Sequence, residues 1–251
     1  MGRLAPVSLH VERLGETGPR VVLVHGSVSP GWATWSAQRP LADRYRLVLP
    51  IRSGYPPNPP LASVDFDVQA DELAGLLQPG DHVVGHSYGA VIGLLAAARA
   101  TVRLGSLTVI EPPAFGLVAE LPEARRLIDE MSRFFEAPHP AREFMVGFLA
   151  LVGSGAKVPD LLSPALEQSV RATMVERPPW EAIFPFQALR RLALPMLLVS
   201  GAHDPVYDAV CDRVEEELGA RRVVLAGAGH SVPRLGQPFN DALEAFIDSP
   251  C

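Results

Sequence analysis

The sequence predicts an α/β fold in which a mostly parallel β-sheet is flanked by helices on both faces. Short, β-branched apolar runs alternate with longer segments whose apolar residues recur every three or four positions. This alternation is typical of parallel strands joined by covering helices. Most of the runs are apolar without interruption, as expected of strands that are buried on both faces. At 251 residues, the chain can form one such core with an inserted subdomain, but not two full-sized domains.

Six segments are predicted as buried strands: residues 21–25, 45–50, 82–86, 107–111, 196–200 and 222–227. Residues 7–14 alternate apolar with polar side chains and are predicted to form an antiparallel edge hairpin. The helical period predicts helices over residues 64–77, 88–100 and 238–247.

The interval 115–190 contains several helical stretches but no convincing strand, and we predict that it forms a helical cap. The core would then consist of residues 1–114 and 191–251. Within the cap, Ser163 followed by Pro164 is typical of an N-cap residue and the first position of a helix.

Composition narrows the classes of function. Hydrophobic residues make up 48% of the chain and charged residues 20%, which are ordinary values for a globular protein. A net charge of −6 without a basic face argues against a nucleic-acid partner. Two cysteines, Cys211 and Cys251, do not make a disulfide framework. No apolar run suits a signal peptide or approaches the roughly 20 residues of a membrane span, so we expect a cytoplasmic protein without a membrane partner.

The strongest local motif is Gly85-His86-Ser87-Tyr88-Gly89, which lies where a predicted strand meets a predicted helix. A serine on such a sharp turn is exposed as a nucleophile, and the neighbouring turns leave room only for small residues two positions before and after it. Gly85 and Gly89 meet that requirement. The motif therefore predicts that Ser87 is a catalytic nucleophile, whereas a serine in an ordinary strand-to-helix turn is the alternative.

A serine nucleophile needs a base, and His230 is the best placed of the seven histidines. It lies in the Gly-rich segment AGAGHSVP, after the last predicted strand, where a loop at the carboxyl edge of the sheet can reach Ser87. His25 and His203, which also lie at strand ends, are the closest competitors.

The histidine in turn needs a carboxylate that fixes its tautomer. Asp204, in the segment MLLVSGAHDP, directly follows a buried strand, and we predict that it is this acid. An aspartate before proline also favours a turn, so a purely structural role is the alternative. Glu111, at the end of the preceding strand, is the rival acid.

Backbone amides are suited to stabilise the oxyanion of a tetrahedral intermediate, because they need little reorganisation. We predict that two amides play this role: that of Tyr88, which follows the predicted nucleophile, and that of Ser27, which lies in the turn after the first buried strand. His25 and Gly26 would then shape this turn.

These motifs together resemble the α/β-hydrolase superfamily in its smaller, capped form. The resemblance covers nearly the whole chain outside 115–190 and is carried by His25-Gly26, GHSYG at 85–89, SGAHD at 200–204 and GAGH at 227–230. The order serine, acid, histidine is also that of the superfamily. One departure follows the strand at 45–50, where many relatives have Asp-x-Arg-Gly-x-Gly; this chain has IRSGYPP, with Arg52 and Gly54 but no aspartate.

The resemblance implies a serine esterase or lactonase that acts through an acyl-enzyme on a small molecule. Aromatic residues of the first loop and the cap suggest an apolar binding pocket, the candidates being Trp32, Trp35, Phe144, Phe148, Trp180 and Phe184. Any one of them can equally pack the cap against the core. The same triad also serves carbon–carbon bond hydrolysis, acyl transfer or cyclisation, and a non-catalytic ligand-binding protein is a further alternative.

No cofactor is expected. The histidines and acids lack metal-site spacings such as H-E-x-x-H, and the Gly-rich segments match no nucleotide-binding fingerprint. The sequence does not indicate the oligomeric state.

Overall fold

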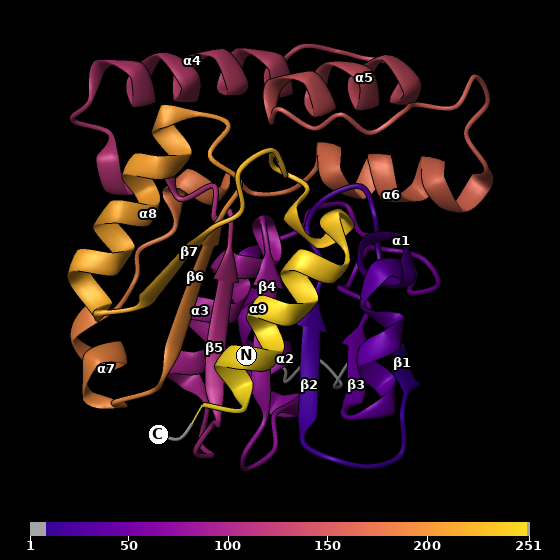
Figure 1. Cartoon of the computed structure of the whole chain (residues 1–251). Coiled ribbons are helices and arrows are strands. Elements are labelled where there is room, and N and C mark those ends of the chain that lie inside the picture. Colours follow the sequence, from indigo (N-terminus) through magenta and orange to yellow (C-terminus); the bar gives the residue numbers. More distant parts are fainter. Residues whose placement is uncertain (1–8, 250–251) are drawn as a thin grey trace, which may run out of the picture.

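A computed structural model describes residues 9–249 and contains, over that range, a seven-stranded sheet in the order β1-β3-β2-β4-β5-β6-β7 (Figure 1). The strands are β1 (Val11–Leu14), β2 (Arg20–Val24), β3 (Arg46–Pro50), β4 (His82–His86), β5 (Ser106–Ile110), β6 (Met196–Ser200) and β7 (Arg221–Val224). β1 pairs with β3 in antiparallel orientation, and all other neighbouring strands are parallel. The sheet confirms the predicted fold class.

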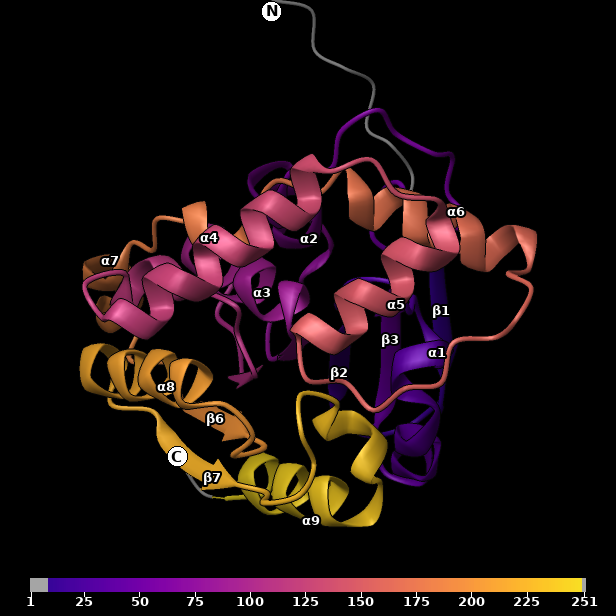
Figure 2. The same cartoon turned by 90° about the horizontal axis from the view of Figure 1, so that it is seen from above.

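Helices cover both faces of the sheet because its strands are apolar on both sides. On β2, for example, Val22 and Val24 belong to one hydrophobic cluster, whereas Val21 and Leu23 belong to another. The first cluster includes side chains of α2 (Phe66–Leu76), α3 (Tyr88–Arg99) and α8 (Pro205–Leu218). The second includes side chains of α1 (Trp32–Trp35), the 3₁₀ helix η1 (Ser36–Asp43) and α9 (Gln237–Ile247), which lie on the opposite face (Figure 2).

The segment between β5 and β6 is helical. It contains η2 (Phe115–Val118), α4 (Pro122–Glu136), α5 (Ala141–Leu151), α6 (Pro164–Met174), η3 (Pro179–Glu181) and α7 (Phe186–Arg191). Figure 1 shows α4, α5 and α6 above the carboxyl ends of the strands. By contrast, α7 packs beside the sheet against α3 and α8. Ser163 accepts a hydrogen bond from the Leu166 amide and Pro164 begins α6, which confirms the predicted helix start.

The predicted edge hairpin over residues 7–14 lies partly outside the described residues, because residues 7 and 8 precede them. Its described part forms the single edge strand β1, which is antiparallel as predicted but pairs with the distant β3 rather than with a neighbouring strand of a hairpin. Cys211 is a buried, free thiol, and Cys251 lies outside the described range. None of the helices within residues 9–249 is long and apolar enough to cross a membrane.

We predict that Phe239→Ala lowers the free energy of unfolding by about 3 to 5 kcal/mol. Phe239 is fully buried and anchors α9 to the sheet, so its removal leaves a cavity that a rigid helix–sheet interface cannot refill. Denaturant unfolding measures the change. Ile183→Ala is the control, because Ile183 is 88% exposed and its loss should change stability by less than about 0.5 kcal/mol. Equal effects of the two substitutions would contradict this account of the core.

Candidate active site

Ser87 lies on the turn between β4 and α3, with φ 55° and ψ −124°. A non-glycine residue rarely adopts a positive φ, so this conformation is strained. The surrounding backbones are packed closely: a Cβ atom on Gly85 would lie 2.4 Å from the Gly89 carbonyl oxygen, and one on Gly89 would lie 2.4 Å from that of Val24. Only glycine fits at these two positions, for the steric reason that the sequence pattern suggested.

His230 lies next to Ser87 at the carboxyl edge of the sheet. The Ser87 hydroxyl is 2.9 Å from Nε2 of His230, and the opposite ring nitrogen, Nδ1, is 3.4 Å from Oε2 of Glu111. Burial lowers the pKa of His230 to about 3, so the ring is neutral at pH 7 and can accept a proton. His86 donates from Nε2 to the His230 carbonyl at 2.8 Å and thereby holds the loop that carries His230.

Glu111 directly follows β5 and is fully buried. It too has a positive φ, of 49°. Its Oε1 accepts a hydrogen bond from the Gly201 amide at 2.6 Å, while Oε2 faces His230. Burial raises the pKa of Glu111, and the Gly201 hydrogen bond acts in the opposite direction.

Asp204, the acid expected from the sequence, is placed elsewhere. Its backbone is extended, and its carboxylate accepts a hydrogen bond from the Val206 amide at 2.7 Å, so that it caps the N-terminus of α8. No ion pair within 4.0 Å joins it to His230, although both residues are described. Glu111 follows β5, which lies between β4 and β6 in the sheet, and it is the carboxylate that lies beside His230.

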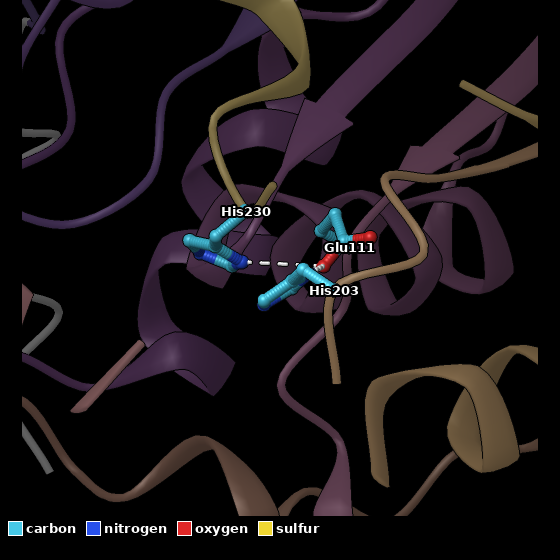
Figure 3. Close-up of side chains that lie close together, drawn as sticks. All are labelled: Glu111, His203 and His230. Atoms are coloured by element: carbon cyan, nitrogen blue, oxygen red, sulfur yellow. Dashed lines mark hydrogen bonds and ion pairs between the residues drawn. The ribbon is translucent and has the colours of Figure 1, made fainter. Parts of the chain in front are cut away.

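His203 and His25, the competing bases, have other surroundings. Nδ1 of His203 is 3.3 Å from Oε2 of Glu111, beside His230 (Figure 3), yet neither ring nitrogen of His203 has a hydrogen-bond partner among the described residues. His25 is fully buried. Its Nε2 accepts from the Arg52 amide at 3.0 Å, so Nδ1 carries the proton and donates to the Gly26 carbonyl. His25 therefore shapes its own loop.

The loop after β2 brings Ser27 close to Ser87. The packing is so close that a Cβ atom on Gly26 would lie 2.9 Å from Cβ of Ser87. Tyr88 is the first residue of α3, and the first amides of a helix have no partner within the helix. The Tyr88 amide therefore lies at the start of a helix directly after Ser87, and Ser27 lies in the loop that packs against Ser87.

Residues from the end of α6 hold this loop, a contact that the sequence analysis missed. Glu176 accepts a hydrogen bond from the Ser27 hydroxyl at 2.5 Å, and the Thr173 hydroxyl accepts one from the Val28 amide at 3.0 Å. Val28 has a φ of 68°, a strained value for a β-branched residue. The helical segment above the sheet therefore fixes the backbone on which the predicted oxyanion donor lies.

Arg52 completes the network from the turn after β3. Its guanidinium contacts Glu176 at 2.5 Å and donates to the Gly26 carbonyl at 2.9 Å. Both side chains of the ion pair are only 3% exposed. Tyr55 adds a hydrogen bond to the Glu176 carboxylate at 2.7 Å. The sequence motif around Arg52 thus supports the loop of Ser27, although the aspartate common among relatives is missing.

Two pockets meet at Ser87. The apolar pocket is lined by Ser27, Ser87, Tyr88, Pro113, Met131, Phe135, Phe148, Val152, Glu176, Pro179, Trp180 and Tyr207. The serine-rich pocket is lined by Ser27, Ser29, Thr34, His86, Ser87, Phe148, Leu149, Val152, Ser154, His230, Ser231, Pro233 and Arg234. Phe148 and Val152 belong to both.

Of the six aromatic residues predicted to bind substrate, Phe148 and Trp180 line the apolar pocket. The other four belong to neither pocket wall. Phe144 stacks on Phe134 and Phe148 within the cap, Trp35 packs against His86, Trp32 lies under the Arg39 guanidinium, and Phe184 packs on Phe186. These four aromatic side chains pack against other side chains and do not line the space beside Ser87. Met131, Phe135 and Tyr207 line the pocket instead, and no sequence pattern distinguished them.

This fold and site belong to a known family: the chain is a member of the alpha/beta hydrolase family, whose sequence profile matches residues 21–244. It is 29% identical to a pimeloyl-[acyl-carrier protein] methyl ester esterase of Aeromonas hydrophila, over 96% of this chain and all of the relative. It is 26% identical to the lipase LipV of Mycobacterium tuberculosis, over 91% of this chain and 93% of the relative.

Among solved structures, a thermophilic esterase from Thermogutta terrifontis is similar with a TM-score of 0.73 and 22% identity, over 95% of this chain and 92% of the other. The family and its relatives identify the protein as an enzyme of the carboxylic ester hydrolase type.

We predict that Glu176→Gln lowers the free energy of unfolding by about 3 to 5 kcal/mol, because it leaves the buried Arg52 guanidinium without a counter-charge. Denaturant unfolding again provides the measurement. The double variant Arg52→Met/Glu176→Met should lower the free energy of unfolding by less than Glu176→Gln does, because it leaves no unpaired buried charge. Glu181→Gln, at an exposed ion pair with Arg177, should cost less than about 1 kcal/mol. If the double variant is less stable than Glu176→Gln, the ion pair does not explain the stability at this position.

Proposed function

We propose that this enzyme hydrolyses small, largely apolar carboxylic esters or lactones through an acyl-enzyme formed on Ser87. The 2.9 Å contact between the Ser87 hydroxyl and Nε2 of His230 carries the proposal. It joins a strained serine that lines both pockets to a neutral base, which is the arrangement that acyl transfer requires. The names of the two sequence relatives, an ester esterase and a lipase, support the same bond type.

In the proposed mechanism, Ser87 Oγ attacks the ester carbonyl while Nε2 of His230 takes its proton. The amides of Ser27 and Tyr88 donate to the oxyanion of the tetrahedral intermediate. His230 then passes the proton to the leaving alcohol, and the acyl group stays on Ser87. A water molecule, deprotonated by the same histidine, hydrolyses the acyl-enzyme and restores the serine.

We assign the acid of this mechanism to Glu111 rather than Asp204. Nδ1 of His230 must carry a proton for Nε2 to act as a base, and the Glu111 carboxylate lies 3.4 Å from that nitrogen. Its negative charge also stabilises the imidazolium that forms during attack. Asp204 is engaged at the start of α8.

The two pockets suggest how the substrate is oriented. His230 must reach the leaving oxygen to protonate it, and His230 lines only the serine-rich pocket. The alcohol part of the ester would therefore occupy that pocket, beside Arg234 and Ser231. The acyl part would occupy the apolar pocket, against Met131, Phe135 and Trp180.

We predict that Glu111→Gln reduces kcat on the order of 10³ to 10⁴ fold, because an amide no longer holds His230 in the required tautomer. Asp204→Asn is the matched control. Asparagine caps a helix about as well as aspartate, so kcat should fall less than about tenfold. Steady-state kinetics on an ester substrate measure both variants, and the reverse order of effects would return the acid role to Asp204.

We further predict that lengthening the acyl chain raises kcat/KM, whereas lengthening the alkyl chain of the alcohol does not. Each acyl methylene that fits the apolar pocket should contribute up to roughly 0.8 kcal/mol, or about fourfold. Acyl p-nitrophenyl esters from acetate upward test the first series, and alkyl acetates followed by acid release test the second. Ser87→Ala should abolish turnover of both. A flat acyl profile, or a preference for charged acyl groups, would count against the proposed orientation.

A further inference from the structure

His230 and two neighbouring side chains bring three potential metal-ligand atoms close together on the side of His230 that faces away from Ser87. They are Oε2 of Glu111, Nδ1 of His203 and Nδ1 of His230, which come from three separate loops at the carboxyl edge of the sheet (Figure 3). One ligand atom from each residue lies within 4.8 Å of those of the other two. Two imidazoles and one carboxylate are a ligand set typical of Zn²⁺ and related divalent transition metals.

The spacing of these atoms suits a tetrahedral ion. Zn²⁺ binds imidazole nitrogen at about 2.0–2.1 Å and carboxylate oxygen at about 2.0–2.2 Å, which places neighbouring ligands of a tetrahedron about 3.3–3.5 Å apart. The Glu111 oxygen is 3.3 Å from the His203 nitrogen and 3.4 Å from the His230 nitrogen. Two of the three separations thus match the edges of such a tetrahedron, and the third, between the two nitrogens, is within 4.8 Å. A water molecule could supply the fourth position.

His203 provides an independent observation. Its side chain is only 13% exposed, yet neither ring nitrogen has a hydrogen-bond partner among the described residues. An unpartnered buried imidazole is costly. Glu111, fully buried, faces no lysine or arginine within 4.0 Å in the described part of the chain. A cation between the two groups would satisfy both.

We propose that Glu111, His203 and His230 form an inhibitory binding site for Zn²⁺ or a similar divalent transition metal. A metal on Nδ1 of His230 takes the lone pair at that nitrogen, and the neutral ring must then carry its proton on Nε2. That nitrogen no longer accepts the proton of Ser87, so the metal-bound enzyme is inactive. This consequence rests on the proposed function, whereas the binding site itself does not.

Binding is tested on the Ser87→Ala variant, which retains all three ligands. Co²⁺ serves as a spectroscopic probe, because tetrahedral Co²⁺ has an intense visible absorption, and Zn²⁺ binding is followed by calorimetry. We expect one equivalent of either metal to bind, with Zn²⁺ displacing Co²⁺. Absence of both the absorption and the binding heat would overturn the proposal.

His203→Gln in the same Ser87→Ala background removes one ligand and should raise the Zn²⁺ dissociation constant at least about tenfold. His139→Gln is the matched control, because His139 contacts the Phe134 carbonyl in the cap and is not a member of the cluster. It should leave the dissociation constant unchanged. If the two substitutions weaken binding equally, or neither does, the metal does not bind at this site.

In the wild-type protein, Zn²⁺ should inhibit ester hydrolysis, and a chelator should restore it. Each variant is compared with its own metal-free activity, and His203→Gln should need at least about tenfold more Zn²⁺ for half inhibition. Metal-free protein without esterase activity would refute the proposed function while leaving the metal site intact. Zn²⁺ binding with undiminished turnover would overturn the inhibitory role.

Discussion

Two backbone hydrogen bonds fix the positions of Ser87 and Glu111, because they continue the hydrogen bonding of the sheet one residue beyond the ends of the strands. The Ser87 amide donates to the Ile110 carbonyl at 2.8 Å, and the Glu111 amide donates to the Val199 carbonyl at 3.1 Å. Each bond fixes the backbone of a reactive residue at the point where it turns away from the sheet. The position of Ser87 relative to Glu111 is therefore set by β4, β5 and β6 rather than by flexible loops, as the precise geometry of the proposed mechanism requires.

Four of the five non-glycine residues with positive φ in the described part of the chain follow the carboxyl ends of strands. They are Val28, Ser87, Glu111 and Ala202, whereas the fifth, Ala193, precedes β6. Each such conformation costs on the order of 1–3 kcal/mol and persists only where surrounding contacts hold it. Here the contacts include the extended ladder at Ser87 and Glu111 and the Thr173 hydroxyl on the Val28 amide.

The sequence alone predicts those parts of the fold and of the candidate site that depend on a local pattern of residues. Strand runs, the elbow around Ser87 and the Gly-rich loop of His230 are recognisable from residues close together in the chain. The carboxylate that lies beside His230 was not, because choosing between Asp204 and Glu111 requires the order of the strands, and an aspartate before proline satisfies a helix start equally well. The residues that line the pockets could not be predicted from the sequence either. Phe144 and Phe148 lie one helical turn apart and both are buried, yet only Phe148 borders the space at Ser87.

The buried pair of Arg52 and Glu176 links the helices above the sheet to the loop that carries Ser27. Glu176 and Thr173 each form a hydrogen bond to this loop, so a movement of α6 away from the sheet would break both bonds and free the loop's backbone. The position of α6 and the conformation of the loop beside Ser87 are therefore coupled.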